Sequence, residues 1–257
     1  MPVKSLEKAL RILLSFEPER QTQTLLQISE RTSIPPTSLY RFLETLERYG
    51  FIRADKEGRL YRLGPTVFRL GMLCHDSVDL RETAKPEMEK IAELTGESVF
   101  LTVRDGRSSV CIECAEGKHW IRLTQRIGAA LPLHAGAAAK VLLAYMPEPE
   151  RQNMLRTLEL RAIGPGTICS RTVLEKKIRA IRSRGFDISH EEVDAGSCGV
   201  AVPVFSAKGE VVAALASGGP MYRFTDKGTK QILEMLLKAS QVIGKNLGVA
   251  GEEVLSQ

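Results

Sequence analysis

Three amphipathic helical segments followed at once by a two-stranded hairpin fill the first 64 residues, and few folds accommodate that order. Apolar residues recur every three or four positions in 5–16, 24–31 and 36–49, which is the spacing of one helix face. Two short strand-like runs, 51–54 and 59–63, then flank a turn that ends in a glycine. This order predicts a winged helix-turn-helix domain, with a small helical domain of another kind as the alternative.

The helix periodicity also predicts which side chains are buried and which are left outside. The inward stripes are Leu6, Ala9, Leu10, Leu13 and Leu14 in the first helix, and Leu39, Phe42, Leu43 and Leu46 in the third. The outward face of the third helix then carries, near its start, Thr37, Ser38, Tyr40 and Arg41. In a winged helix-turn-helix, this part of the third helix enters the major groove of DNA.

The outward residues have the chemistry that base and phosphate contacts need. Arg41 can donate to the O6 and N7 of guanine or contact a phosphate, and the hydroxyls can donate to phosphate or touch a thymine methyl. The hairpin adds basic residues that suit phosphates or a minor groove, namely Arg53, Lys56, Arg59 and Arg62. Each set could instead be a solvated polar surface, and Glu44, Glu47, Asp55 and Glu57 dilute the positive field. We therefore expect DNA affinity to come from a dimer.

Charge and composition narrow the class of protein further. Residues 1–64 hold 11 Lys and Arg against 8 Asp and Glu, so they carry +3 of the net charge of +5. A chain that is 43% hydrophobic and 26% charged is globular, not disordered. Its apolar stretches fall short of the roughly 20 residues of a membrane span, and its first residues lack the apolar segment of a secretory signal. We expect a cytoplasmic protein that makes no membrane contact.

The remaining residues predict a linker and a second domain. Residues 65–75 form a helix whose apolar side chains have no partner in the small domain, so a second copy of the chain is the expected partner. A longer helix over 79–94 follows. The predicted strands are 98–104, 108–115, 120–125, 186–192, 199–206 and 210–217, and the predicted helices are 135–145, 148–158, 172–184 and 225–247. This arrangement predicts an α+β domain with a mostly antiparallel sheet.

Neither the cysteines nor any motif points to catalysis. Five irregularly placed cysteines make no disulfide scaffold. Cys111 and Cys114 form a C-x-x-C inside a predicted strand, where positions three apart point to opposite faces, and no further zinc ligands are evident. We expect them, like Cys74 and Cys169, to be packing residues. No G-x-S-x-G, H-E-x-x-H, P-loop or dinucleotide motif is present, so we expect neither an enzyme nor a metal or cofactor.

Three segments together resemble the IclR family of bacterial transcriptional regulators. They are "LLQISERTSIPPTSLYRFLETLERYG" at 25–50 with "YRLG" at 61–64, "GAALPLHAGAAAKVLLA" at 128–144, and "RGFDISHEEVDAGSCGVAVPVF" at 184–205 with "GEVVAALASGGP" at 209–220. The resemblance implies a winged helix-turn-helix over 1–64, a linker helix over 65–78 and a GAF-like effector domain over 79–257. The implied partners are double-stranded operator DNA, a small organic-acid effector, and one or three further copies in a homodimer or a dimer of dimers. Repression and activation both stay open.

Two segments of the second domain are candidates for the effector site. Small residues let the backbone approach a ligand, and free N–H groups at the start of the following helix attract an anion. The resemblance implies that this loop contacts the effector. The residues are Gly128, Ala129, Ala130, Leu131 and Leu133, with a tightly packed helix start as the alternative. His134 beside them is expected to be structural. In the second segment Ser197 and Cys198 could bond a ligand, and Gly199 leaves room for it.

The aligned positions favour a larger, less polar effector. The resemblance implies that relatives binding small hydrophilic acids present two hydroxyls and a carboxylate at positions that are Ala216, Gly218 and Ser189 here. Ser217 lies between the first two and should point to the other face. An aromatic or medium-length carboxylic acid would suit such a site. It would be a catabolic intermediate, and the regulated genes would form a catabolic operon. A sensor or enzyme on a GAF-like domain without DNA binding is the alternative, and the basic hairpin speaks against it.

Overall fold

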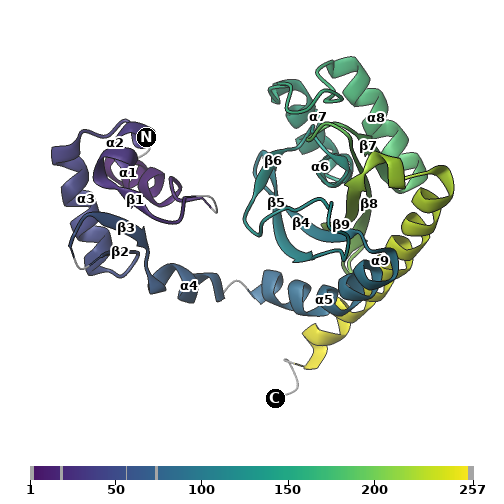
Figure 1. Cartoon of the computed structure of the whole chain (residues 1–257), viewed down its shortest axis with the longest axis horizontal. Helices are drawn as coiled ribbons and strands as arrows, with labels where there is room; N and C mark the ends of the chain where they lie inside the picture. Colours follow the sequence, from purple (N-terminus) through teal and green to yellow (C-terminus); the bar gives the residue numbers. More distant parts are fainter. Residues whose placement is uncertain (1–2, 18–19, 56, 73–74, 254–257) are drawn as a thin grey trace. The chain divides into compact units, whose positions relative to one another are not determined.

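The computed structural model describes residues 3–17, 20–55, 57–72 and 75–253, and the chain divides into two compact units, 1–78 and 79–257 (Figure 1). The smaller unit contains α1 (Lys4–Leu13), β1 (Gln23–Thr24), α2 (Leu25–Thr32), α3 (Pro36–Arg48), β2 (Ile52–Ala54), β3 (Leu60–Leu63) and α4 (Pro65–Met72). β3 pairs with β2 on one side and with the short β1 on the other. This is the predicted winged helix-turn-helix.

Local signals set the boundaries of these helices. At the start of α2, the Thr24 side chain accepts from the Gln27 amide at 3.3 Å while the Gln27 side chain accepts from the Thr24 amide at 2.8 Å. α3 opens on Pro36, whose missing N–H has no role at that position. A φ of +74° at Gly50 takes the chain out of α3 into the hairpin.

The core of the smaller unit corrects one prediction. It is formed by Ile12, Ile28, Leu39, Leu43 and Ile52, among others. In α1 the fully buried side chain is Ile12, whereas Leu6, Leu10 and Leu14 of the predicted inward stripe are 57%, 48% and 77% exposed. Two neighbouring stripes of α1 are apolar, and the unit is too small to bury both. The second stripe is left as an exposed apolar face.

The larger unit is an α+β domain with an antiparallel sheet. Its strands are β4 (Ser98–Asp105), β5 (Ser108–Ala115), β6 (Ala130–Pro132), β7 (Asp187–His190), β8 (Ser197–Phe205) and β9 (Val211–Pro220), in the order β6-β5-β4-β9-β8-β7. Its helices are α5 (His75–Thr95), α6 (Ala137–Ala144), α7 (Glu148–Thr157), α8 (Arg171–Arg184), the short η1 (Met221–Arg223) and α9 (Asp226–Glu253). Among the described residues, no helix has the length and apolar composition that crossing a bilayer requires.

The sheet lies between two layers of helices (Figure 1). Residues of α5 and α9 pack with Leu215 and Val200 in one core, and residues of α6, α7 and α8 pack with Ala216 and Ala201 in the other. Neighbouring strand residues therefore alternate between the two faces. As predicted, Ser217 points away from Ala216, and its hydroxyl donates to the Ser98 carbonyl at 3.0 Å.

The strand predicted over 120–125 is not formed. After β5 the chain leaves the sheet, and the Gly117 amide bonds the Ser98 hydroxyl at 3.2 Å while Arg223 donates to the Ile121 carbonyl at 2.8 Å. β6 pairs with the edge of β5 instead, with Leu131 opposite Ser109. A short run of alternating polarity looked like a strand, but the partner edge that it would need is already occupied.

A β-bulge overturns the expectation that the two cysteines of the C-x-x-C point to opposite faces of the sheet. Cys111 pairs with Thr102 and Cys114 pairs with Phe100, and these partners lie two apart on β4. Both thiols therefore point to the same face of the sheet, because Ile112 is an extra residue in β5. Burial raises the pKa of Cys111 to about 12 and that of Cys114 to about 11. Both thiols are therefore protonated at neutral pH, which suits the packing role expected for them.

Candidate functional site

The exposed face of α3 carries the predicted polar residues. Thr37, Arg41 and Tyr40 are exposed, the last at 58%, while Ser38 is half-buried and Leu39 and Leu43 face the core. Ser38 and Arg41 also line a hollow of about 480 Å³ whose opposite wall includes Lys8 of α1. Sequence periodicity did not single out Lys8, because nothing in the chain order places α1 beside the start of α3.

The wing brings two arginines directly opposite each other. Arg53 and Arg62 are cross-strand partners in the β2–β3 ladder, and both are exposed, while their neighbours Ile52 and Tyr61 face the core. Like charges at opposed positions destabilise a sheet unless an anion lies between them. Arg59 pairs weakly with Glu57 at 3.8 Å, with both side chains exposed. Lys56, the fourth predicted residue, lies outside the described residues.

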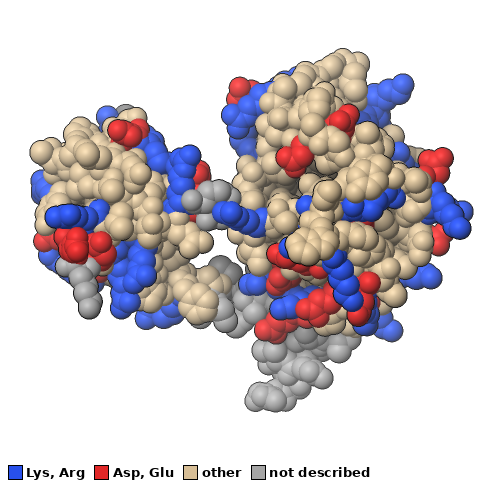
Figure 2. Space-filling model, in the orientation of Figure 1, with Lys and Arg blue, Asp and Glu red and all other residues tan. Residues whose placement is uncertain are grey.

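The turn of the wing is held by its own acidic residue. The Asp55 carboxylate accepts from the Arg59 amide at 2.8 Å and from the Leu60 amide at 3.2 Å. These backbone amides lower the pKa of Asp55. The sequence suggested that Asp55 dilutes the positive field. In the structure, Asp55 also fixes the turn of the wing. Figure 2 shows Lys and Arg side chains on the visible face of this unit, with acidic groups among them.

We expect Arg62→Gln to stabilise the smaller unit by about 0.2–1 kcal/mol, since it removes repulsion from Arg53. The same change should weaken DNA binding, because a phosphate contact is lost. Urea unfolding measures the first effect and fluorescence anisotropy with duplex DNA the second. Arg59→Gln is the matched control, since its side chain has no opposed arginine. Equal stability of Arg62→Gln and the parent would show that the pair carries no strain.

In the larger unit, several predicted effector residues share the sheet face that α6 covers. We call Phe100, Ser189, Gly199, Ala216 and Gly218 the effector face. Ser189 pairs with Gly199, and Gly199 pairs with Gly218, so they form one row across β7, β8 and β9. A Cβ on Gly199 would lie 3.1 Å from the Ser189 hydroxyl and 3.9 Å from the Ala137 methyl. A side chain at 199 would therefore crowd the Ser189 hydroxyl, whereas its distance from Ala137 would be an ordinary van der Waals contact.

The space above Gly218 is smaller than predicted. A Cβ on Gly218 would lie 3.0 Å from Leu123 Cδ1 and 3.7 Å from Phe100 Cε2. Leu123 belongs to the segment between β5 and β6, which thus covers this end of the effector face. Sequence reasoning missed both Phe100 and Leu123, because neither carries a polar group that marks a site.

The predicted loop at 128–133 contains the short edge strand β6, and several of its amides are bonded within the protein. The Gly128 amide donates to the Cys111 carbonyl at 2.7 Å, and the Ala129 amide donates to the Arg126 carbonyl at 2.9 Å. Ala130 and Leu131 pair with β5, and Leu133 is fully buried in the core beneath α6. The amides of Gly128 and Ala129 are therefore bonded within the protein, whereas the free N–H groups were expected at the start of the following helix.

The second predicted segment divides between the two faces. Cys198 lies in the core with α5 and α9, on the side opposite Ala216, and burial raises its pKa to about 11. Ser197 is half-buried, and its hydroxyl donates to the Asp194 carbonyl at 2.6 Å. Strand alternation thus brings Gly199 to the effector face and excludes Cys198.

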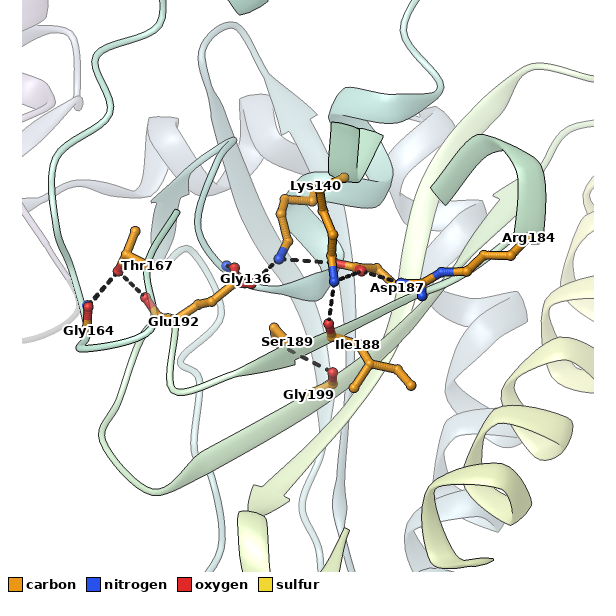
Figure 3. Close-up of polar contacts among 11 residues, drawn as sticks. Gly136, Lys140, Gly164, Thr167, Arg184, Asp187, Ile188, Ser189, Glu192 and Gly199 are labelled. Carbon is orange, nitrogen blue, oxygen red and sulfur yellow. Dashed lines mark hydrogen bonds and ion pairs between the residues drawn. The ribbon is translucent and has the colours of Figure 1, made fainter. Parts of the chain in front are cut away.

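A buried ionic network lies beside the effector face (Figure 3). Lys140 of α6 is fully buried, and its Nζ lies 3.1 Å from Asp187 Oδ2 and also contacts Glu192 Oε1. The other oxygen of Asp187 lies 2.9 Å from Lys177 Nζ and 2.8 Å from Arg184 Nη2. Sequence reasoning missed this network, because Lys140 looked like an interruption in an apolar helix.

Charged side chains hold α6 at both ends. Glu192 Oε2 accepts from the Gly136 amide at 2.9 Å, so a carboxylate of the protein occupies the position where an anion was expected. At the other end the Ala144 carbonyl accepts from Arg151 Nη1 at 3.4 Å and from Arg182 Nη1 at 3.3 Å. These signs match the helix dipole, negative at the N-terminus and positive at the C-terminus.

His134 is fully buried at the start of this segment. Its Nε2 lies 2.8 Å from the Arg161 carbonyl and donates to it, which fits the structural role expected for it. Among the residues that the structure describes, no group of three or more His, Cys, Asp or Glu side chains could hold a metal ion.

A polar recognition helix and a basic wing in one unit are the features of a winged helix-turn-helix DNA-binding protein, and the other unit is an α+β domain. Comparison with known families agrees. Residues 5–56 match the IclR helix-turn-helix domain, and residues 72–245 match the model described as "Bacterial transcriptional regulator IclR C-terminal". The chain belongs to the IclR family.

Individual relatives are similar over almost the whole chain. The HTH-type transcriptional regulator XynR of Escherichia coli is 32% identical over 96% of this chain and 99% of its own. The HTH-type transcriptional regulator KipR of Bacillus subtilis is 31% identical over 95% of this chain and 97% of its own. An IclR homolog from Microbacterium hydrocarbonoxydans, complexed with 4-hydroxybenzoate, matches with a TM-score of 0.83 and 25% identity over 94% and 98%. These relatives are regulators, as expected for a chain without enzyme motifs.

Proposed function

We propose that this protein regulates a catabolic operon by binding operator DNA under the control of a small organic acid. Residues 1–64 bind DNA in the cytoplasm, 65–78 form the linker, and 79–257 bind the effector. The observation that carries the proposal is the exposed face of α3 beside the opposed arginines of the wing. A gel shift with the DNA upstream of the gene tests it. Absence of any shift with that DNA, at low salt, would contradict it.

A homodimer, alone or within a dimer of dimers, gives the proposed regulator its DNA affinity. The smaller unit exposes Val3, Leu6, Leu10 and Leu14 along α1, and Phe68 of α4 is 73% exposed. A second copy would cover such apolar surface. Two winged units on one face of DNA then need half-sites about 34 Å apart or a multiple of that distance. Light scattering that finds a stable monomer at micromolar concentration would contradict this assembly.

The effector face favours an acid with an apolar body. Phe100, Leu123 and Ala216 offer apolar surface, and Ser189 offers one hydroxyl. No side-chain hydroxyl or carboxylate stands at 216 or 218, where hydrophilic acids would need them. The similar structure that binds 4-hydroxybenzoate supports an aromatic acid here. Since Gly128 and Ala129 use their amides internally, the effector carboxylate relies on other donors.

We expect Ala216→Leu to abolish effector binding, because the added atoms fill the effector face. DNA binding without effector should stay at the parent level, since Ala216 lies in the other unit. Calorimetry with aromatic acids, glyoxylate and pyruvate measures effector binding, and fluorescence anisotropy with operator DNA measures DNA binding. Ala213→Ser is the control, because residue 213 belongs to the opposite face. Tight binding of glyoxylate or pyruvate, with no response to any larger acid, would contradict the proposed effector class.

A further inference from the structure

A hollow of about 460 Å³ lies between α7 and α8, and its wall is unusually basic. Four guanidinium groups line it, from Arg151, Arg156, Arg179 and Arg182, against the carboxylates of Glu148 and Glu175. Small-molecule sites in proteins are typically about 300–1,000 Å³ in volume. The hollow is therefore large enough for a small ligand, and its balance of charge favours an anion.

The nearby acceptors do not neutralise this charge. Glu148 pairs with Arg151 and also accepts from the Gln152 amide group at 2.9 Å, so it is committed within α7. Arg151 is buried, and its Nη1 donates to the Met146 carbonyl at 2.8 Å. Burial and, to a smaller extent, the neighbouring charge of Arg182 both lower the pKa of Arg151. Arg182 thus adds to the positive charge around Arg151, although burial is the larger cause of the lowered pKa.

Two of the guanidinium groups keep their donors for a ligand. Arg156 and Arg179 are exposed, and they face the hollow from α7 and α8 respectively. Within the described part of the chain, Arg179 has no hydrogen bond or ion pair, and Arg156 donates only from Nε to a carbonyl of its own helix at 3.4 Å. The floor between them includes Leu155 and Ile178, which are buried apolar side chains.

We propose that this hollow is a second ligand site, which binds a small phosphate monoester. The planar fork of Arg matches phosphate oxygens in pairs, and two forks from facing helices suit a doubly charged group. Leu155 and Ile178 would contact the organic part of the ligand. This site is distinct from the effector face, because it lies between α7 and α8 and shares no lining residue with that face.

The experiment is calorimetry on the full chain with phenyl phosphate, inorganic phosphate and phenol. We expect saturable binding of phenyl phosphate, weaker binding of inorganic phosphate, and no binding of phenol. Arg156→Gln combined with Arg179→Gln should weaken phenyl phosphate binding by at least about tenfold, because two charge-assisted contacts are lost. Lys176→Gln removes a positive charge from α8 outside the hollow and should leave the affinity unchanged.

Two further variants sharpen the test. Glu175→Gln should tighten binding, since it removes a carboxylate of the wall that makes no ion pair within the described part of the chain and that repels the ligand. Ser189→Ala should leave phenyl phosphate binding unchanged, because Ser189 lies on the effector face and outside the core cluster that contains Leu155 and Ile178. The proposal is overturned if Lys176→Gln weakens binding as much as the double variant, if Ser189→Ala abolishes it, or if the double variant weakens only DNA binding while no small phosphate binds.

Discussion

Replacing Lys140 with methionine is expected to lower the free energy of unfolding by about 3–5 kcal/mol, the cost of breaking a buried ion pair from one side. Methionine has a similar volume, so the loss comes from charge and not from a cavity. Asp187 and Glu192, which are 0% and 5% exposed, would lose a shared cation that water cannot replace. Asp187 keeps its ion pairs with Lys177 and Arg184, so the larger part of the lost electrostatic stabilisation falls on Glu192.

Urea unfolding of the larger unit measures this effect, and two variants make it specific. Lys176→Met changes an exposed lysine on α8 and should shift stability by no more than about 0.5 kcal/mol. Lys140→Met combined with Glu192→Gln should recover part of the loss, because the orphaned carboxylate is then neutral. A loss below about 1 kcal/mol for Lys140→Met would mean that water reaches the network and that it is not buried in solution.

Replacing Arg41 with alanine is expected to weaken operator binding by about 1–3 kcal/mol and to relax specificity at one base position. Arg41 is exposed on α3 and lines the hollow that Lys8 shares, so its guanidinium is available to a base edge. Arg59→Ala should instead weaken binding to all sequences and reduce the salt slope by about one, as loss of a phosphate contact does.

Footprinting and anisotropy over a range of salt concentrations separate these two effects. Arg48→Ala is the matched control on the same helix, because Arg48 lies in the last turn of α3, 4.0 Å from Glu44, at the end that does not enter the groove. It should bind operator like the parent. If Arg41→Ala and Arg59→Ala also bound like the parent, both DNA-reading elements would be placed wrongly.

Local sequence signals predicted the smaller unit well because its boundaries depend on nearby residues. The capping pair Thr24 and Gln27, the proline at the start of α3 and the glycine after it all act within a few positions. The outward face of α3 follows from the same periodicity. The inward face of α1 could not be predicted, because the sequence offers two apolar stripes and only packing against Ile28 and Leu39 selects the one with Ile12.

In the larger unit, several features depend on contacts between residues that are distant in the sequence, and these could not be predicted from local patterns. Lys140 and Glu192 are 52 positions apart, and no local pattern pairs them. Cys111 and Cys114 were assigned to opposite faces because an inserted residue in β5 leaves no mark in the sequence. Residues 120–125 alternate like a strand, yet the tie from Arg223 to Ile121 holds them outside the sheet.

The charged hydrogen bonds at both ends of α6 affect how the ligand specificity of this fold can change. Glu192 fixes one end of α6, and Arg151 and Arg182 fix the other. We therefore expect α6 to keep its position when residues on the sheet opposite it change. Substitutions at 189 or 216 then alter the shape and polarity of the effector face while α6 stays in place. A side chain at 199 or 218, by contrast, would bring its Cβ to 3.1 Å from the Ser189 hydroxyl or 3.0 Å from Leu123. Libraries randomised at 189 and 216 should therefore yield folded biosensors with new inducers, whereas libraries in α6 should yield mostly insoluble protein.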